Sequence, residues 1–323
     1  MSFKAYLTAV SIGASALFGV SQAANAKDIV LGSAPNLQTV PILVALDKGY
    51  FKDEQLTLKM VKFVSGRRAL EALIGGQLDI AFMAEYPVAI AALRKQKFAT
   101  ISTISRYLAN RVISKGSVGF KTISDLNGKK IGTTRGSNTE YFTEALMKKA
   151  GIKAEVLNVS PPDIVPALAR GDIDAGVMFP DFYASAKEAL GSDYREYKSD
   201  AYVAQFVLSA SPEMLSKRPK EVQGFLKALI KAEKFIKANP TEAQKIYSKA
   251  TGGRVTFEMA KGRWSEADYA IELNKGLVNL LVSEAKWVVS KGAVKGAATA
   301  ANMKKYLATA PLMAIDPSRV TID

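Results

Sequence analysis

The first third of the chain alternates short apolar runs with amphipathic segments. The runs at 28–33 and 79–83 and the alternating segment 56–64 predict strands, because each is short and ends close to glycine, serine or a charged residue. Apolar positions recur at helical spacing in 41–50 and 67–75, which predicts two helices between these strands. This order of strands and helices is typical of a parallel sheet covered by helices.

The same order returns in the second third of the chain. Strands are predicted at 130–134, 154–159 and 174–179, with helices at 139–150 and 164–170 between them. The sequence therefore predicts a second α/β unit built like the first.

Individual residues recur together with the pattern. The set that repeats at an offset of 95 flanks the joint between a helix and the next strand: Ala72-Leu73, Gly76, Asp79 and Met83 return as Ala167-Leu168, Gly171, Asp174 and Met178. Likewise, Leu31-Gly32-Ser33 corresponds to Ile131-Gly132-Thr133. An internal duplication explains this recurrence, and the shared chemistry of helix–glycine–strand joints is the alternative. Both explanations predict two similar lobes.

Two extended segments are expected to connect the lobes. Residues 101–105 follow the first α/β unit and residues 202–209 follow the second, and both have the pattern of a strand. Two crossings of this kind form a hinge. We therefore expect a discontinuous first lobe, residues 27–114 and 203–323, and a second lobe inserted near residues 115–202.

Helical spacing dominates the last third of the chain. Ser211-Pro212 has the serine N-cap and first-turn proline that begin a helix. We expect helices at 211–238, 240–249, 267–289 and 297–307. This helical tail is expected to pack back on the first lobe.

The first 26 residues have the composition of a secretory signal peptide. Lys4 precedes an apolar stretch from Ala5 to Val20, and the small-residue triplet Ala24-Asn25-Ala26 follows. The stretch is about 16 residues long, shorter than the ~20 that span a bilayer, so cleavage is favoured over a membrane anchor. The chain has no cysteine for a lipid anchor, and we expect a protein released into the periplasm.

Composition excludes several kinds of chemistry. The 323 residues include no cysteine and no histidine, which rules out a thiolate nucleophile, a Cys/His zinc site, a Ser-His-Asp triad and an imidazole proton shuttle. We expect neither a metal nor a cofactor. The formal charge of +14, from 44 basic and 30 acidic residues, favours an anionic ligand. No basic run is interleaved with aromatic residues, so a nucleic-acid partner is not expected.

Candidate ligand-binding residues lie where the predicted strands end. Open α/β sheets bind ligands at the carboxyl ends of their strands, where helix N-termini present free N–H groups. The candidates at these ends are Asn36, Gln38, Ser65, Gly66, Glu85, Tyr86, Arg135, Gly136, Ser137, Asn138, Thr139, Phe179 and Asp181.

The turn from Arg135 to Thr139 has the composition of an anion-binding site. Gly136 permits a tight turn, Ser137 and Thr139 carry hydroxyl groups, and a helix is predicted to begin here. An ordinary helix cap is the alternative, because serine and threonine are common N-caps.

Glu85 needs a separate explanation, because a carboxylate beside an anion site repels the anion. It can pair with a cationic group of the ligand or with Arg106, a further candidate, or it can lie in a solvated loop. Tyr86, Phe179 and Phe182 can form an apolar wall for an organic ligand, or they can pack in the core.

With these features, the chain resembles the periplasmic substrate-binding proteins of bacterial ABC importers, specifically the nitrate/sulfonate/taurine group. The resemblance covers roughly residues 28–251 and is carried by PILVALDKGYFKDEQL at 41–56, GQLDIA at 76–81 and ISDLNGKKIGTT at 123–134, followed by the Gly136-Ser137 turn. Gln55 departs from the family, which usually has glycine there. Phe179 to Phe182 departs from sulfonate binders, which often carry tryptophan at the start of this segment.

The resemblance implies a two-lobed periplasmic-binding-protein fold of type II, each lobe a mostly parallel sheet flanked by helices. It also implies cleft closure around a small molecule and delivery to a membrane permease. The predicted aromatic wall favours a sulfonate-like organic anion over nitrate, and we expect a monomer. The pyrimidine-synthase branch of this broad family relies on histidine and cysteine, which this chain lacks.

Two other functions stay open. One is a secreted enzyme that uses carboxylates, for instance Glu85 with Asp181. The other is a ligand-binding protein of the same fold that signals to a membrane sensor instead of a permease.

Overall fold

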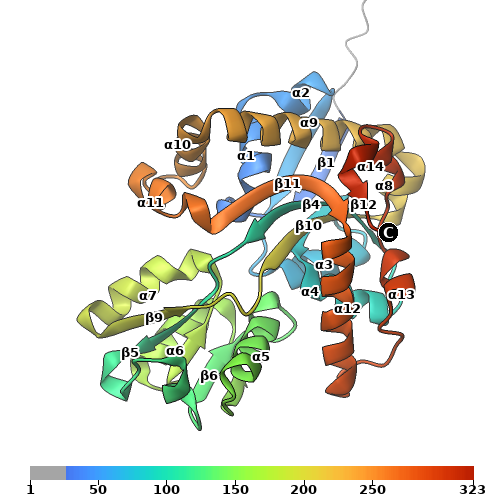
Figure 1. The fold of residues 1–323 in the computed structure, drawn as a ribbon. Helices are drawn as coiled ribbons and strands as arrows, with labels where there is room; N and C mark the ends of the chain where they lie inside the picture. Colours follow the sequence, from blue (N-terminus) through green and yellow to red (C-terminus); the bar gives the residue numbers. More distant parts are fainter. Residues whose placement is uncertain (1–26) are drawn as a thin grey trace, which may run out of the picture.

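A computed structural model of the protein describes residues 27–323, and the predicted signal peptide lies outside the described residues. Figure 1 shows a larger lobe above a smaller one, with extended segments running between them. Each lobe contains one β-sheet.

The larger lobe is built on a seven-stranded mixed sheet with the order β12-β11-β4-β10-β3-β1-β2. β1 pairs in parallel with β2 and β3, whereas β10 pairs antiparallel with β3 and β4. The strands are Lys27–Gly32 (β1), Leu56–Val61 (β2), Ile80–Ala84 (β3), Ala99–Tyr107 (β4), Ala204–Ala210 (β10), Ala267–Asn274 (β11) and Val320–Thr321 (β12).

The smaller lobe has a five-stranded mixed sheet with the order β7-β6-β8-β5-β9. β6 pairs in parallel with β7 and β8, and β5 pairs antiparallel with β8 and β9. The strands are Arg111–Lys115 (β5), Lys130–Thr133 (β6), Glu155–Asn158 (β7), Ala175–Val177 (β8) and Tyr194–Lys198 (β9).

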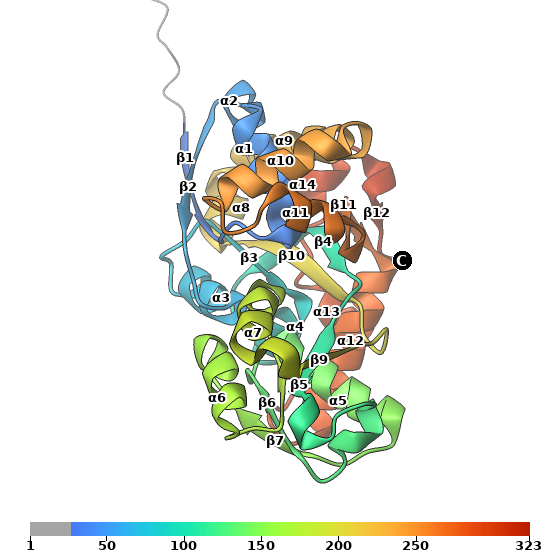
Figure 2. The ribbon, with the colours of Figure 1, turned by 90° about the vertical axis from the view of Figure 1, so that its left-hand side faces the viewer.

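Helices flank both sheets. In the larger lobe they are Val40–Asp47 (α1), Tyr50–Asp53 (α2), Gly66–Ile74 (α3), Glu85–Leu93 (α4), Pro212–Lys217 (α8), Pro219–Ala238 (α9), Pro240–Ala250 (α10), Phe257–Gly262 (α11), Lys275–Ser290 (α12), Ala300–Lys304 (α13) and Ala310–Met313 (α14). In the smaller lobe they are Asn138–Ala150 (α5), Ile164–Arg170 (α6) and Tyr183–Leu190 (α7). Figures 1 and 2 show α12 running from the larger lobe toward α5 of the smaller one.

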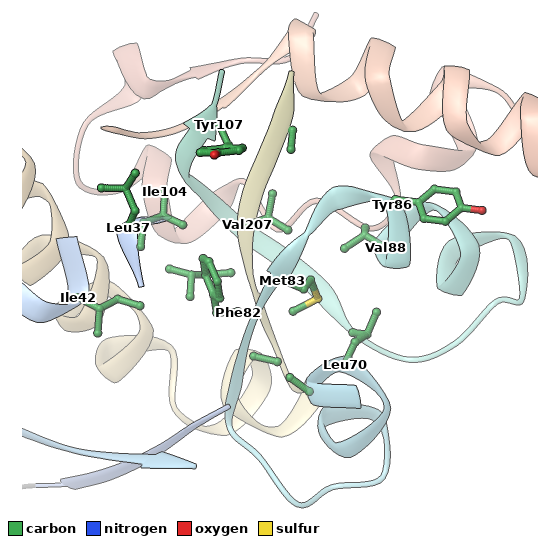
Figure 3. Packing of buried hydrophobic residues seen from close by; sticks show 14 of the residues in the cluster. Leu37, Ile42, Leu70, Phe82, Met83, Tyr86, Val88, Ile104, Tyr107 and Val207 are labelled. Atoms are coloured by element: carbon green, nitrogen blue, oxygen red, sulfur yellow. The ribbon is translucent and has the colours of Figure 1, made fainter. Parts of the chain in front are cut away.

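The core of the larger lobe fixes the segment that follows β1. Figure 3 shows Leu37 beside Ile104 among the buried apolar side chains. The hydroxyl of Tyr269 on β11 donates to the Leu37 carbonyl at 2.9 Å, and that of Ser105 on β4 donates to the Gln38 carbonyl at 2.9 Å. This segment is therefore tied to two strands before any ligand is considered.

The chain crosses between the lobes twice. β4 lies in the larger sheet and β5 in the smaller one, and the return runs from β9 to β10. Because β5 pairs with β8 and β9, residues 111–114 belong to the smaller sheet, whereas the sequence prediction placed them in the first lobe.

The predicted helix 267–289 is wrong for residues 267–274, which form β11. Tyr269, Ile271 and Leu273 are buried at every second position, and the strand pairs antiparallel with β4. The same apolar residues also fit helical spacing together with those that follow. Residues 267–274 therefore form a strand rather than a helix because β4, which is distant in the sequence, is available to pair with them.

The residues that recur in the sequence make the same contacts in both lobes. A carboxylate oxygen of Asp79 accepts a hydrogen bond from the Val30 N–H at 2.8 Å, and one of Asp174 accepts from the Lys130 N–H at 2.8 Å. A Cβ on Gly32 would lie 2.5 Å from a Leu78 methyl carbon, and one on Gly132 would lie 2.6 Å from that of Ile173. The larger lobe thus uses a glycine and an aspartate to join β1 to β3, and the smaller lobe uses the equivalent pair to join β6 to β8.

We predict that Asp79→Ala and Asp174→Ala each lower the free energy of unfolding by about 1–2 kcal/mol, because each leaves a strand N–H without its acceptor. Asp79→Ala has the larger effect, since Asp79 also pairs with Arg218 at 3.2 Å. Urea denaturation measures both losses. The control is Asp172→Ala, whose exposed carboxylate pairs with Arg170, and equal effects for all three variants contradict the prediction.

Candidate functional site

A cavity lies between the two lobes, at the carboxyl ends of β1 and β3 and the N-termini of α3 and α5. Its volume is about 110 Å³. A cavity of about 150 Å³ holds a benzene molecule, so this one has room for a solute of similar or smaller size. The lining residues are Gly32, Ser33, Ala34, Asn36, Gln38, Phe63, Val64, Ser65, Gly66, Arg67, Ala69, Phe82, Met83, Ala84, Pro87, Ser137, Asn138, Phe179, Pro180, Asp181 and Phe206.

Three side chains of the larger lobe that line this cavity carry a polar atom without a hydrogen-bond partner. Within residues 27–323, the Ser33 hydroxyl, the Gln38 side-chain amide nitrogen and the Arg67 Nε are buried and make no hydrogen bond. Ser33 is 5% exposed and Gln38 is 2% exposed, so water does not easily replace the missing partners. Because all three are hydrogen-bond donors, they favour an acceptor. The Arg67 guanidinium pairs with Glu71 at 3.5 Å through its Nη1, and its free Nε favours a further negatively charged partner.

The backbone holds the Arg67 side chain where the lobes meet. Ser65 caps α3 by accepting a hydrogen bond from the Arg68 N–H at 3.4 Å. Gly66 lets the helix start approach β3, because a Cβ there would lie 2.8 Å from the Met83 Cα. Gly136 of the smaller lobe has φ +73°, and a Cβ on it would lie 2.7 Å from the Arg67 Cδ. Only glycine at position 136 therefore leaves room for this contact between the lobes.

The smaller lobe contributes the N-terminus of α5. Ser137 occupies the N-cap position but makes no capping bond, because its hydroxyl donates to the Thr134 carbonyl at 2.7 Å. The first-turn N–H groups of α5 are thus left without a side-chain cap, close to Ser137 and Asn138 in the cavity wall. An uncapped helix N-terminus favours negative charge.

Aromatic side chains form the apolar part of the wall. Phe82 on β3 stacks on Phe206 of β10 with ring centroids 5.4 Å apart, and Phe63 and Phe179 complete this surface. This apolar wall and the donors of Ser33, Gln38 and Arg67 together suit an organic solute with an anionic group.

Asp181 is the one carboxylate among the residues that line the cavity. Its side chain is exposed to water, although neighbouring protein atoms partly desolvate the carboxylate. This desolvation raises the pKa of Asp181 to about 6, and the positive charges of Arg263 and Arg254 oppose the rise.

Arg67 also lines an outer groove next to the cavity, together with Tyr86, Arg135 and Gly136. The Tyr86 hydroxyl donates to a Glu140 oxygen at 3.3 Å, and the Gly136 N–H donates to the same oxygen at 2.7 Å. These three predicted site residues therefore lie in the outer groove, and the Tyr86 hydroxyl links the larger lobe to Glu140 of the smaller one.

Eight predicted residues line the cavity itself: Asn36, Gln38, Ser65, Gly66, Ser137, Asn138, Phe179 and Asp181. The structure does not bring Thr139 or Arg106 to its wall. The Thr139 hydroxyl is buried beside those of Thr133 and Ser137. Arg106 pairs with Asp268 at 2.7 Å and with Glu272, both on β11.

Glu85 is neither a cavity residue nor a loop residue. It begins α4, is completely buried, and accepts hydrogen bonds from the Tyr202 hydroxyl at 2.5 Å and the Gln205 N–H at 3.0 Å. Tyr202 lies on the crossing between β9 and β10, so Glu85 ties this crossing to the larger lobe. The carboxylate pair Glu85–Asp181, considered above for an enzyme, is therefore not assembled.

Glu85 forms a buried pair with Glu284 of α12. Glu284 is also completely buried and has no donor from another residue in the described part of the chain, so a proton shared with Glu85 is the only source of a hydrogen bond. Burial raises the pKa of Glu85 to about 7, against the opposing effect of the Tyr202 hydroxyl. Burial and the charge of Glu85 raise the pKa of Glu284 well above its usual range.

Sequence reasoning missed Ser33, Arg67 and the aromatic pair Phe82–Phe206. Ser33 directly follows β1 and Arg67 follows the predicted site residue Gly66 by one position, so a wider window at each strand end would have included both. No sequence pattern around Phe206 indicated a place in the site. Phe206 reaches Phe82 only because β10, which follows the second crossing, pairs with β3.

The lobes are held against each other on two sides of the crossings. On one side, the Tyr141 hydroxyl of α5 lies 3.0 Å from the Ser283 hydroxyl of α12. On the other, Arg263 donates to the Pro180 carbonyl at 3.5 Å. Arg111 of β5 pairs there with Glu266, which precedes β11. The structure therefore has its lobes closed over the cavity.

Comparisons with known proteins agree with this architecture. The sequence profile of the family described as NMT1/THI5 like matches residues 36–243. The taurine-binding periplasmic protein of Escherichia coli K12 is 32% identical over 206 residues, which cover 60% of this chain and 62% of that protein. A 4-amino-5-hydroxymethyl-2-methylpyrimidine phosphate synthase of Saccharomyces cerevisiae is 25% identical over 235 residues, 68% of this chain and 69% of that enzyme.

The solved structures include similar folds. The periplasmic aliphatic sulphonate binding protein SsuA from Escherichia coli matches with a TM-score of 0.72 at 17% identity, over 87% of this chain and 92% of that one. At this identity the match establishes the fold.

The buried pair Glu85–Glu284 predicts a pH-dependent stability. Both carboxyl groups bind a proton more tightly in the folded than in the unfolded protein. Their contribution to the free energy of unfolding is therefore complete below the ordinary carboxyl pKa of 4.5, and it is lost as the pH rises to about 7 and beyond. In the Glu284→Gln variant the free energy of unfolding should fall less steeply with rising pH, by roughly 1 kcal/mol per pH unit. The reason is that the amide still donates a hydrogen bond toward Glu85 but carries no charge.

Urea denaturation between pH 5 and pH 8 measures this difference. Glu213→Gln is the matched control, since its exposed carboxylate pairs with Lys217. The prediction is wrong if the Glu284→Gln and wild-type stability curves run parallel.

Proposed function

The chain belongs to the NMT1/THI5-like family, and we propose that it is a periplasmic solute-binding protein that captures a small sulfonate-like anion and delivers it to an ABC permease. Its fold is the two-lobed periplasmic-binding-protein fold of type II, and its relatives include binding proteins of this kind. The relative from Escherichia coli is named for taurine, a two-carbon sulfonate.

One observation carries the proposal: three side chains that line the cavity carry buried donor atoms without hydrogen-bond partners. An unpartnered buried donor costs about 1–3 kcal/mol, so three of them favour a bound acceptor strongly. A sulfonate has three oxygens arranged around one atom, and it matches the donors Ser33, Gln38 and Arg67 in number. The uncapped start of α5 adds further N–H groups from the opposite lobe.

Closure follows from this division of the site. A ligand held by Arg67 and Gln38 on one lobe and by Asn138 on the other contacts both only when the lobes meet. It therefore binds the closed state more tightly and shifts the population toward it. The closed protein then presents a surface that a permease can distinguish from the open one.

Export of the chain fits the same function. Residues 1–26 have the composition of a cleavable signal peptide. In the described part of the chain, no helix combines the length and the apolar character needed to cross a membrane. We propose that the mature protein acts as a monomer in the periplasm.

The synthase relative supplies an alternative that the residues do not favour. The chain has no histidine and no cysteine, and Glu85 is buried away from the cavity. Among residues 27–323, no three or more carboxylates gather where they could hold a metal ion. A binding protein accounts for the donors without requiring catalytic groups.

The Arg67 guanidinium gives a direct test. We predict that Arg67→Gln weakens binding of short alkanesulfonates and of taurine by about 10–100-fold, because it removes the charged donor from the cavity. Titration calorimetry of the mature protein measures the loss. Arg68→Gln is the matched control, since Arg68 is the next residue on α3 and also pairs with Glu71, at 2.9 Å against 3.5 Å for Arg67, but does not line the cavity.

Wild-type protein that binds no sulfonate, or an Arg68→Gln variant that loses as much affinity as Arg67→Gln, contradicts the proposed function. Thermal unfolding of both variants shows that each remains folded.

A further inference from the structure

Two carboxyl groups meet in the interior of the larger lobe without a cation between them. Glu85 begins α4 and Glu284 lies on α12, and both residues are completely buried. Within residues 27–323, neither carboxyl group forms an ion pair with a lysine or an arginine. Two adjacent buried carboxyl groups do not both stay ionised, because neither water nor a cation compensates their charges. The pair therefore holds at least one proton.

The hydrogen bonds indicate which member depends on the proton. Glu85 accepts from the Tyr202 hydroxyl and the Gln205 N–H, and it stands at the N-terminus of α4, where negative charge is favoured. In the described part of the chain, neither oxygen of Glu284 has a donor from another residue. Only as an acid can Glu284 donate a hydrogen bond to Glu85. Glu284 is therefore the member that needs a proton to be accommodated.

The smaller lobe covers the neighbourhood of this pair through Tyr141 of α5. The Tyr141 ring lies edge-on to that of Tyr202, with centroids 5.4 Å apart. Its hydroxyl lies 3.0 Å from that of Ser283, the residue that precedes Glu284 on α12. Separation of the lobes withdraws α5 from this position and lets water approach Glu85 and its partner. Since water stabilises the ionised carboxyl groups, the open protein binds the proton less tightly.

We propose that the pair Glu85–Glu284 is a proton-binding site that takes up a proton when the lobes close. This inference rests on the closure described under the proposed function, but it does not depend on the identity of the ligand. Low pH favours closure and rising pH opposes it. A solute that stabilises the closed form is then bound together with a proton, so the pH around the protein adjusts how tightly the solute is held.

The pKa values give the direction and the pH range of this effect. Burial raises the pKa of Glu85 to about 7, and burial together with the charge of Glu85 raises the pKa of Glu284 well above its usual range. A group whose pKa is higher in the closed form favours closure fully below its pKa in the open form. This effect is lost as the pH rises through the closed-form value. The population of the closed form is therefore expected to fall between pH 5 and pH 8.

The titratable side chains packed around the pair keep one charge state in this range. Burial raises the pKa of each above the ordinary value of 10.0, and they are Tyr86 of α4, Tyr141 of α5 and Tyr202 of the second crossing. From α5, the charges of Glu140 and Glu144 act on Tyr86, and Glu144 pairs with Lys291 of α12 at 3.2 Å. In the cavity, the pKa of Asp181 is raised to about 6, so each test compares the wild type with a variant of the pair.

Glu284→Gln tests the site, because the amide has nearly the same volume and donates to Glu85 but binds no proton in this range. Small-angle X-ray scattering of the ligand-free mature protein measures how far the lobes are open. In the wild type, the ratio of closed to open protein should fall by up to about tenfold per pH unit between pH 6 and pH 8. In Glu284→Gln this ratio should stay nearly constant.

Glu144→Gln is the matched control. It removes a carboxylate that also joins α5 to α12, through Lys291 at 3.2 Å, but that is not part of the buried pair. Loss of this ion pair can shift the ratio toward the open form, but the ratio should keep the pH dependence of the wild type. Thermal unfolding checks that both variants are folded.

Titration calorimetry counts the proton. Ethanesulfonate is titrated into the mature protein at pH 7 in two buffers of different ionisation enthalpy, and the difference in heat gives the number of protons taken up. The wild type should take up more protons than Glu284→Gln, by about one per bound ligand. Because the titration of Asp181 is common to both proteins, it cancels in this difference.

The outcomes separate this site from the proposed function. If wild-type scattering does not change between pH 5 and pH 8, or if Glu284→Gln has the pH dependence of the wild type, the proton-binding site is overturned. Equal proton uptake by the two proteins overturns it as well, and the proposed function stands. If ethanesulfonate does not bind but closure still depends on pH through Glu284, the proposed function is contradicted and the proton-binding site stands.

Discussion

A buried hydrogen-bond donor must find an acceptor, and this requirement gives the closed cavity its chemical identity. Most buried polar groups of the protein satisfy each other, as Tyr202 and Gln205 satisfy Glu85. The Ser33 hydroxyl, the Gln38 amide nitrogen and the Arg67 Nε do not, and all three side chains line the cavity between the lobes. The fold holds them there through strands that are far apart in sequence, so the missing acceptor has to come from outside the chain.

The hinge and the site depend on each other through the crossings. Glu85 and Glu284 are buried beside Tyr202, which lies on the second crossing, and the Tyr86 hydroxyl reaches Glu140 of the smaller lobe. Contacts on both sides of the crossings hold the lobes closed. A solute can enter only when some of these contacts open, and the ligand restores the closed state by adding its own contacts to both lobes.

The fold class and much of the site could be predicted because both depend on local rules. Strand ends in an open α/β sheet mark the ligand face, and three of the residues that this rule selected, Gln38, Asn138 and Asp181, line the cavity. It failed for Glu85, which looks like a loop residue until α12 covers it from two hundred positions further along the chain. It also failed for β11, where pairing with β4 overrides an equally good helical pattern. The errors therefore fall where distant segments decide the environment of a residue.

Sulfur anomalous diffraction from crystals grown with an aminoalkylsulfonate tests the central claim most directly. The chain has no cysteine, so every sulfur of the protein belongs to a methionine and the ligand adds one further peak. We predict that peak within hydrogen-bonding reach of Gln38, Arg67 and Asn138, between closed lobes. A sulfur peak in the outer groove, or crystals with the cavity filled by water alone, would contradict the account.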